Sequence, residues 1–189
     1  MNTILVTDIF GKTPAVIKLN EVLSVGIKSN PIVDPYNGIH MGFKNEAEAY
    51  AYFVENVGLE AYQETLLKVI QSNPSARVLV GFSIGASIIW NLSEQQSIAH
   101  ITRGICYYGS QIRQTPSITP LFDIEFIYPK KEAHFDVVML ASKLAKKENV
   151  KARQVANLHG FMNPCSVNYH NAAYVEELDW LQSSIKLSV

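Results

Sequence analysis

The stretch that decides the fold of this 189-residue chain is Val78-Leu79-Val80-Gly81-Phe82-Ser83-Ile84-Gly85-Ala86-Ser87-Ile88-Ile89-Trp90. Residues 77–80 are typical of a buried strand, and the apolar residues from Ala86 to about residue 95 have helical spacing. The Gly-x-Ser-x-Gly pattern between them predicts a sharp strand-to-helix turn with Ser83 at its apex, since two glycines let strand and helix approach closely. The Ser83 oxygen would then lie at a helix N-terminus, which favours a developing negative charge. The alternative is an ordinary glycine-bearing connection with an incidental serine.

On either side of this stretch, short apolar runs alternate with helical patterns, which predicts one parallel sheet with helices on both faces. The predicted strands are residues 4–7, a segment within 25–33 centred on Ile32-Val33, 77–80, 103–108, 123–128 and 150–156. Four other helices are predicted: one that starts at Thr13-Pro14, one over 46–71 with a break at Gly58, one over 134–148 and one over 171–185. The helix over 134–148 is expected to turn Phe135, Val138, Met139, Ala141 and Leu144 towards the core. The helix over 171–185 is expected to bury Ala172, Val175, Leu178 and Leu181. Residues 111–120 are predicted to be a loop.

Composition favours a single globular domain over residues 1–189. Hydrophobic residues make up 48% of the chain and charged residues 17%, with a net charge of −1, so nothing points to nucleic acid or to a membrane surface as a partner. Cys106 lies in an apolar run and is predicted to be a buried thiol; neither it nor Cys165 has metal-ligand spacing. The N-terminus resembles a first strand rather than a signal peptide, and we expect a cytoplasmic protein.

Ligand sites of parallel sheets form at the carboxyl ends of the strands. Several residues with useful chemistry directly follow predicted strands, and we therefore expect them to meet at one rim of the sheet: Asp8, Ile9, Asp34, Ser83, Tyr108, Glu132 and His159. A serine hydroxyl becomes a good nucleophile when an imidazole takes its proton, and the imidazole needs a carboxylate to orient it. The order along the chain makes His159 the expected base of Ser83. Glu132 is the expected acid, with Asp136, or no effective acid, as the alternatives.

The intermediate of acyl transfer carries an oxyanion that needs backbone N–H donors. We expect one donor from Ile84, which follows the nucleophile, and a second from Ile9 or Phe10 in the turn after the first strand. Aromatic residues at the strand ends are expected to line the substrate site, namely Phe10, Tyr36, Tyr107, Tyr108 and Phe161.

Four motifs in order along nearly the whole chain resemble the dienelactone hydrolase family of α/β-hydrolases. They are Asp8-Ile9-Phe10-Gly11, Val33-Asp34-Pro35-Tyr36, Gly81-Phe82-Ser83-Ile84-Gly85 and His159-Gly160-Phe161-Met162-Asn163-Pro164. The resemblance implies a minimal six-stranded, mostly parallel α/β-hydrolase domain without a lid, an esterase-type activity on a small ester, no metal and no organic cofactor, and oxyanion donors at Ile9 and Ile84. The chain departs from the family in carrying serine at the nucleophile, Asp8 where glutamate is usual, Ala133 where the acid aligns, and no arginine after His159.

Two other classes of protein fit parts of the sequence. One is a non-catalytic α/β-hydrolase-fold protein that binds a small molecule or a protein partner. The other is a nucleotide-binding protein, because Gly11-Lys12-Thr13 has the same residues as the end of a phosphate loop. That loop also needs an upstream glycine, which this chain lacks, so the sequence favours the hydrolase.

Overall fold

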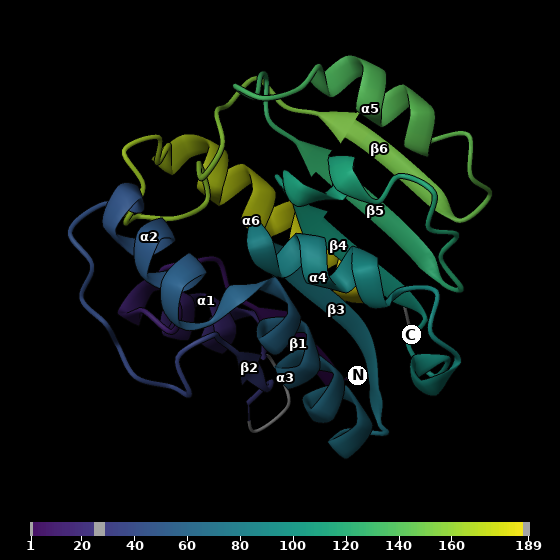
Figure 1. Cartoon of the computed structure of the whole chain (residues 1–189), viewed down its shortest axis with the longest axis horizontal. Coiled ribbons are helices and arrows are strands. Elements are labelled where there is room, and N and C mark those ends of the chain that lie inside the picture. The colour runs from purple at the N-terminus through teal and green to yellow at the C-terminus, as the bar shows by residue number, and fades with distance from the viewer. Residues whose placement is uncertain (1, 25–28, 187–189) are drawn as a thin grey trace.

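A computed structural model describes residues 2–24 and 29–186 of the chain. Six parallel strands form one sheet in the order β2-β1-β3-β4-β5-β6 (Figure 1). Their bounds are β1 Asn2–Val6, β2 Ile32–Val33, β3 Ala76–Phe82, β4 Arg103–Tyr107, β5 Asp123–Tyr128 and β6 Val150–Gln154. The predicted parallel sheet is confirmed, although residues 25–28 of the segment expected to hold the second strand lie outside the described residues.

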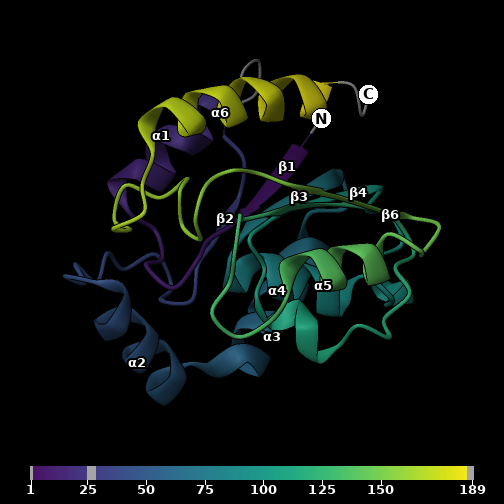
Figure 2. The ribbon, with the colours of Figure 1, turned by 90° about the horizontal axis from the view of Figure 1, so that it is seen from above.

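Helices cover both faces of the sheet (Figure 2). One face carries α1 (Pro14–Leu23) and α6 (Asn171–Lys186), and the other carries α3 (Gly58–Ser72), α4 (Ile84–Leu92) and α5 (Val137–Leu144). Helix α2 (Glu46–Asn56) lies on the same side of the sheet as α3, at the periphery of the molecule (Figure 2). Each face has its own apolar core, so the strands between them are buried on both sides. None of the helices described is both long and apolar enough to cross a bilayer.

Local sequence signals explain where several helices begin. The hydroxyl of Thr13 accepts the backbone N–H of Val16, and proline follows it at the first helical position, so α1 starts where predicted. Asn45 caps α2 in the same way. Gly58 has a φ of +77° and separates α2 from α3, which confirms the predicted break.

The sequence prediction was wrong about where α5 begins and about which of its residues face the core. Asp136 accepts the backbone N–H of Met139, so the helix begins at Val137 rather than at 134. The buried stripe is Val137, Leu140 and Leu144, whereas Val138 and Met139 are 60% and 71% exposed. Both stripes have helical spacing in the sequence, and packing against β5 and β6 selects between them.

Two further local predictions need correction. Helix α6 buries Ala173, Glu177, Leu181, Ser184 and Ile185, whereas the predicted inward residues Ala172 and Val175 are exposed. A hydrophobic pattern could not select Glu177, which is held by Arg153 of β6 and by the Tyr107 hydroxyl. The predicted loop over 111–120 contains a short 3₁₀ helix, η2 (Gln111–Gln114), and a second one, η1 (Gln96–Ile98), follows α4.

Candidate active site

Ser83 occupies a strained turn between β3 and α4, with φ of +51° and ψ of −111°. A side chain on either flanking glycine would collide with the backbone. A Cβ on Gly81 would lie 2.8 Å from the nitrogen of Ala86, and one on Gly85 would lie 2.5 Å from the carbonyl oxygen of Thr7. The two glycines therefore allow α4 to start directly against the end of β1. This is the geometry expected of a nucleophile elbow, in which strain is retained at a functional residue.

Ser83, His159 and Glu132 form a continuous line of side chains at the carboxyl edge of the sheet. The Ser83 Oγ lies 3.0 Å from His159 Nε2, and His159 Nδ1 lies 2.7 Å from Glu132 Oε1. Ser83 follows β3, Glu132 follows β5 and His159 follows β6. Three parallel strands therefore bring together side chains that are up to 76 residues apart in the chain. The Glu132 side chain is 11% exposed and the His159 side chain 29% exposed, which leaves the imidazole accessible to a ligand.

Other residues weighed for the site have structural partners elsewhere. Asp136, the alternative acid, caps α5 and does not contact His159 in the described hydrogen bonds. Asp34 accepts the backbone N–H groups of Tyr36 and Gly38 and so shapes the turn after β2. Thr13 of the Gly11-Lys12-Thr13 sequence is the cap of α1, so this segment forms a helix start.

An open pocket with a volume of about 370 Å³ surrounds Ser83. Ile9 and Ile84, for which oxyanion donors are predicted, both line this pocket. The N–H of Phe10 donates to Asp8 Oδ1 at 2.9 Å, so Ile9 stays the expected oxyanion donor of the two candidates in this turn.

The predicted aromatic lining is present only in part. Phe10 and Tyr108 line the pocket, and the Tyr108 ring lies 4.9 Å from that of His159. Tyr36 and Phe161 lie beneath the surface instead: the Tyr36 hydroxyl donates to the carbonyl oxygen of Ile9, and Phe161 packs on Tyr108. These two aromatic residues support the walls of the pocket and do not line it.

Sequence reasoning missed a contact between the first turn and the loop that carries His159. Asn163 Nδ2 donates to Asp8 Oδ2 at 2.6 Å, and both side chains are 7% exposed. The backbone N–H of Asn163 in turn donates to the carbonyl oxygen of Gly160, next to His159. Burial raises the pKa of the Asp8 carboxyl, while the hydrogen bonds from Phe10 and Asn163 act in the opposite direction. Asp8 and Asn163 fall in motifs quoted above, but no sequence pattern pairs them.

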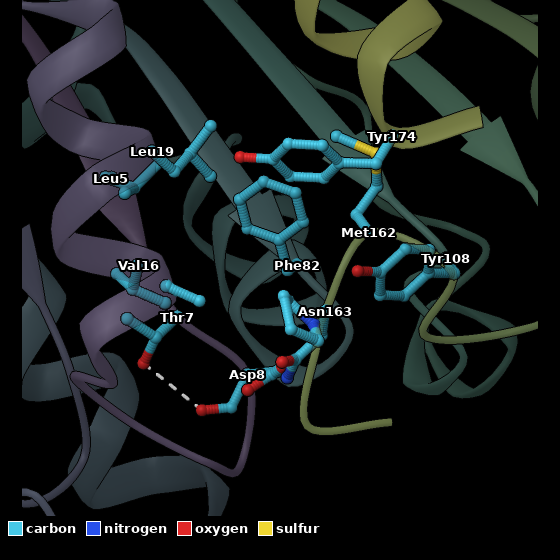
Figure 3. A pocket seen from close by; sticks show the side chains of 12 residues that line it. Leu5, Thr7, Asp8, Val16, Leu19, Phe82, Tyr108, Met162, Asn163 and Tyr174 are labelled. Carbon is cyan, nitrogen blue, oxygen red and sulfur yellow. Dashed lines mark hydrogen bonds between the residues drawn. The ribbon is translucent and has the colours of Figure 1, made fainter. Parts of the chain in front are cut away.

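Asp8 and Tyr108 also border a second, apolar cavity on the α1 side of the sheet (Figure 3). Its lining includes Val16 and Leu19 of α1 together with Phe82 at the end of β3. The wall between the two spaces therefore contains the buried carboxylate described above. Within the described part of the chain, no group of three His, Cys, Asp or Glu side chains is placed to hold a metal ion.

Comparison with known proteins finds a relative in sequence and similar solved structures. YczH, an uncharacterized protein of Bacillus subtilis (strain 168), is 33% identical over 143 residues, which cover 74% of this chain and 69% of YczH. No family model matches the chain.

Among solved structures, a protein of the α/β-hydrolase superfamily from Xanthomonas campestris pv. campestris matches with a TM-score of 0.62 at 15% identity, over 97% of each chain. A dienelactone hydrolase-like promiscuous phosphotriesterase from metagenomic libraries matches at 0.66 and 11% identity, over 98% of this chain and 85% of that one. A dienelactone hydrolase from Anabaena variabilis ATCC 29413 matches at 0.64 and 12% identity, over 97% and 86%. These matches show that the chain has the α/β-hydrolase fold.

Proposed function

We propose that this chain, which belongs to the same family as Bacillus subtilis YczH and has a dienelactone hydrolase-like α/β-hydrolase fold, is a serine hydrolase that cleaves a small carboxylic ester or thioester. The observation that carries the proposal is the hydrogen-bonded line from Ser83 through His159 to Glu132, with the serine held at positive φ. The pocket volume of about 370 Å³ lies at the low end of the range for small-molecule sites, which supports a small substrate.

In the proposed reaction, the Ser83 hydroxyl donates its hydrogen bond to His159 Nε2 and attacks the carbonyl carbon of the ester. The imidazole takes the proton, and Glu132 stabilises the resulting cation through its bond to Nδ1–H. The oxyanion accepts the backbone N–H groups of Ile84 and Ile9. Collapse of this intermediate expels the alcohol or thiol, which takes the proton from His159, and leaves an acyl group on Ser83.

Deacylation repeats the same steps with water. His159 removes a proton from the water as it attacks the acyl carbon, and the proton returns to Ser83 Oγ when the carboxylic acid leaves. Every proton in both half-reactions is therefore handled by one imidazole, and one water molecule is consumed for each ester cleaved.

The test is covalent labelling with a fluorophosphonate probe, followed by peptide mapping. We expect the wild type to be labelled on Ser83, Ser83→Ala to give no labelling, and His159→Gln to slow labelling by a factor on the order of 10³ or more. Ser97→Ala is the matched control, because Ser97 is an exposed serine in η1 that should have no effect. A folded wild type that is neither labelled nor able to cleave 4-nitrophenyl esters would refute the proposal and would favour the non-catalytic alternative.

A further inference from the structure

The loop that carries His159 is tied to helix α2 by a hydrogen bond between two side chains. The Ser166 hydroxyl donates to Glu46 Oε1 at 2.7 Å, although the two residues lie 120 positions apart in the chain. Glu46 is the first residue of α2 and lines the Ser83 pocket, and Ser166 is 6% exposed. A hydrogen bond to a carboxylate is stronger than one between neutral groups. This bond therefore fastens the loop to a helix that comes much earlier in the sequence.

Ser166 connects the Glu46 carboxylate to the backbone of His159. The Ser166 hydroxyl oxygen accepts the backbone N–H of Asn168 at 3.2 Å, and the side-chain amide of Asn168 donates to the carbonyl oxygen of His159 at 2.9 Å. Three successive hydrogen bonds thus lead from Glu46 to the peptide group of the proposed base. Because each of them restrains the next, the first bond affects how the turn that carries the imidazole is held.

Gly160 shows how closely the Glu46–Ser166 pair packs against this turn. It follows His159 directly and has a φ of +81°. A Cβ at this position would lie 2.5 Å from the Ser166 hydroxyl oxygen and 3.2 Å from Glu46 Oε1. The pair therefore fits against the backbone of the turn because residue 160 has no side chain. The backbone that carries the imidazole is held both at the His159 carbonyl and at the residue that follows.

The carboxylate of Glu46 takes no part in the proton transfers proposed above. Ser83 lies within hydrogen-bond distance of His159 Nε2, and Glu132 of Nδ1, so both ring nitrogens already have partners. Among residues 2–24 and 29–186, the Glu46 carboxylate forms its hydrogen bond with Ser166 and belongs to no ion pair. The structure therefore offers the Ser166 hydroxyl as the link between Glu46 and His159.

We infer that Glu46 is a positioning residue for the proposed base: through Ser166 and Asn168 it keeps His159 Nε2 at hydrogen-bond distance from the Ser83 hydroxyl. This inference rests on the proposed hydrolase function and adds to its machinery a residue of α2. Loss of the link should lower kcat, because a displacement of about 1 Å in a catalytic geometry costs on the order of 100-fold. KM should change little, since the link acts on the base rather than on the bound ester.

The test measures kcat and KM for 4-nitrophenyl butyrate, together with the rate of fluorophosphonate labelling of Ser83. Glu46→Ala and Ser166→Ala should each lower kcat and the labelling rate by roughly 10- to 100-fold. Glu46→Gln should retain most of the activity, because its amide oxygen can still accept the Ser166 hydroxyl. The double variant Glu46→Ala/Ser166→Ala should lose no more than either single variant, since both substitutions break the same hydrogen bond.

The matched control is Glu48→Ala. Glu48 lies in the same first turn of α2, but it is exposed, it accepts the backbone N–H of Lys44, and it is not among the residues that line the pocket. Its loss weakens the start of the helix without touching the loop of His159, so kcat should keep its wild-type value. If Glu46→Ala does not fold, Ser166→Ala gives the same test with α2 intact.

Three results would overturn the inference while the hydrolase proposal stands. They are a wild-type kcat in Glu46→Ala or Ser166→Ala, equal losses of kcat in Glu46→Ala and Glu48→Ala, and a rise in KM alone, which would make Glu46 a group that binds the substrate. Absence of both turnover and Ser83 labelling in the folded wild type would refute the hydrolase proposal, and this inference with it.

Discussion

Replacing Gly85 with alanine tests whether the contact between β1 and α4 sets the geometry of the site. The added Cβ would lie 2.5 Å from the Thr7 carbonyl oxygen and 2.6 Å from that of Val6, whereas ordinary contact begins near 3.4 Å. Strand and helix would have to separate by about 0.9 Å, the difference between 3.4 and 2.5 Å. Such overpacking costs about 1–3 kcal/mol, and the better helix propensity of alanine offsets about 1 kcal/mol. We therefore expect a loss of stability of up to about 2 kcal/mol.

The same displacement should reduce turnover more than stability. It moves Ile84, at the start of α4, away from the turn that contains Ile9, and a shift of about 1 Å in a catalytic geometry costs on the order of 100-fold in kcat. Urea unfolding followed by circular dichroism measures the first effect, and hydrolysis of 4-nitrophenyl butyrate measures the second.

Gly38→Ala is the matched control. Gly38 has a φ of +82°, but nothing lies within 4 Å of an added Cβ, so only backbone strain of about 1–2 kcal/mol is expected, with unchanged kcat. If Gly85→Ala unfolds at the wild-type urea concentration and turns over normally, the close approach of strand and helix does not have the role described here.

Three further changes test the acid, the buried carboxylate and the ion pair of α6. Glu132→Gln should lower kcat by about 10²- to 10⁴-fold. Asp136→Ala should cost about 1 kcal/mol of stability and leave kcat unchanged. A loss of kcat in Asp136→Ala with normal kcat in Glu132→Gln would make Asp136 the acid. Burial raises the folded-state pKa of Asp8 above 3.8, so its contribution to stability is present below that value and is lost as pH rises through the folded pKa. The stability of wild type relative to Asp8→Asn, followed in urea titrations, should therefore fall as the pH rises above 3.8, and a constant difference would contradict this. Glu177→Ala leaves Arg153 without its carboxylate partner and should cost about 2 kcal/mol, whereas unchanged stability would show that the pair is neutral.

The sequence contained enough information to predict the fold, because its signals are local and agree with one another. Caps at Thr13 and Asn45, the break at Gly58 and the glycines around Ser83 each act within a few residues of their place in the chain. Parallel strands then bring their carboxyl ends to one edge, which is why Glu132 and His159 could be selected as neighbours of Ser83. The structure has these three side chains in contact, and their catalytic roles stay predictions.

The sequence could not supply information that depends on packing between distant segments. The inward face of α5 depended on which of two apolar stripes fits β5 and β6, and that of α6 includes Glu177, which hydropathy assigns to solvent. Tyr36 and Phe161 follow strands, as Tyr108 does, yet their neighbours bury them below the pocket. Arg113, which also lines the Ser83 pocket, lies in a segment predicted to be a plain loop.

The hydrogen bond between Asp8 and Asn163 joins residues 155 positions apart. A ribosome must therefore add some 155 residues after this turn before the turn can meet the loop that holds it, and the imidazole is made only shortly before that loop is complete. Contacts of such long sequence separation form slowly. During refolding, the proposed esterase activity should return together with the last phase of native structure, so an assay of catalysis also reports when these two distant segments have come together.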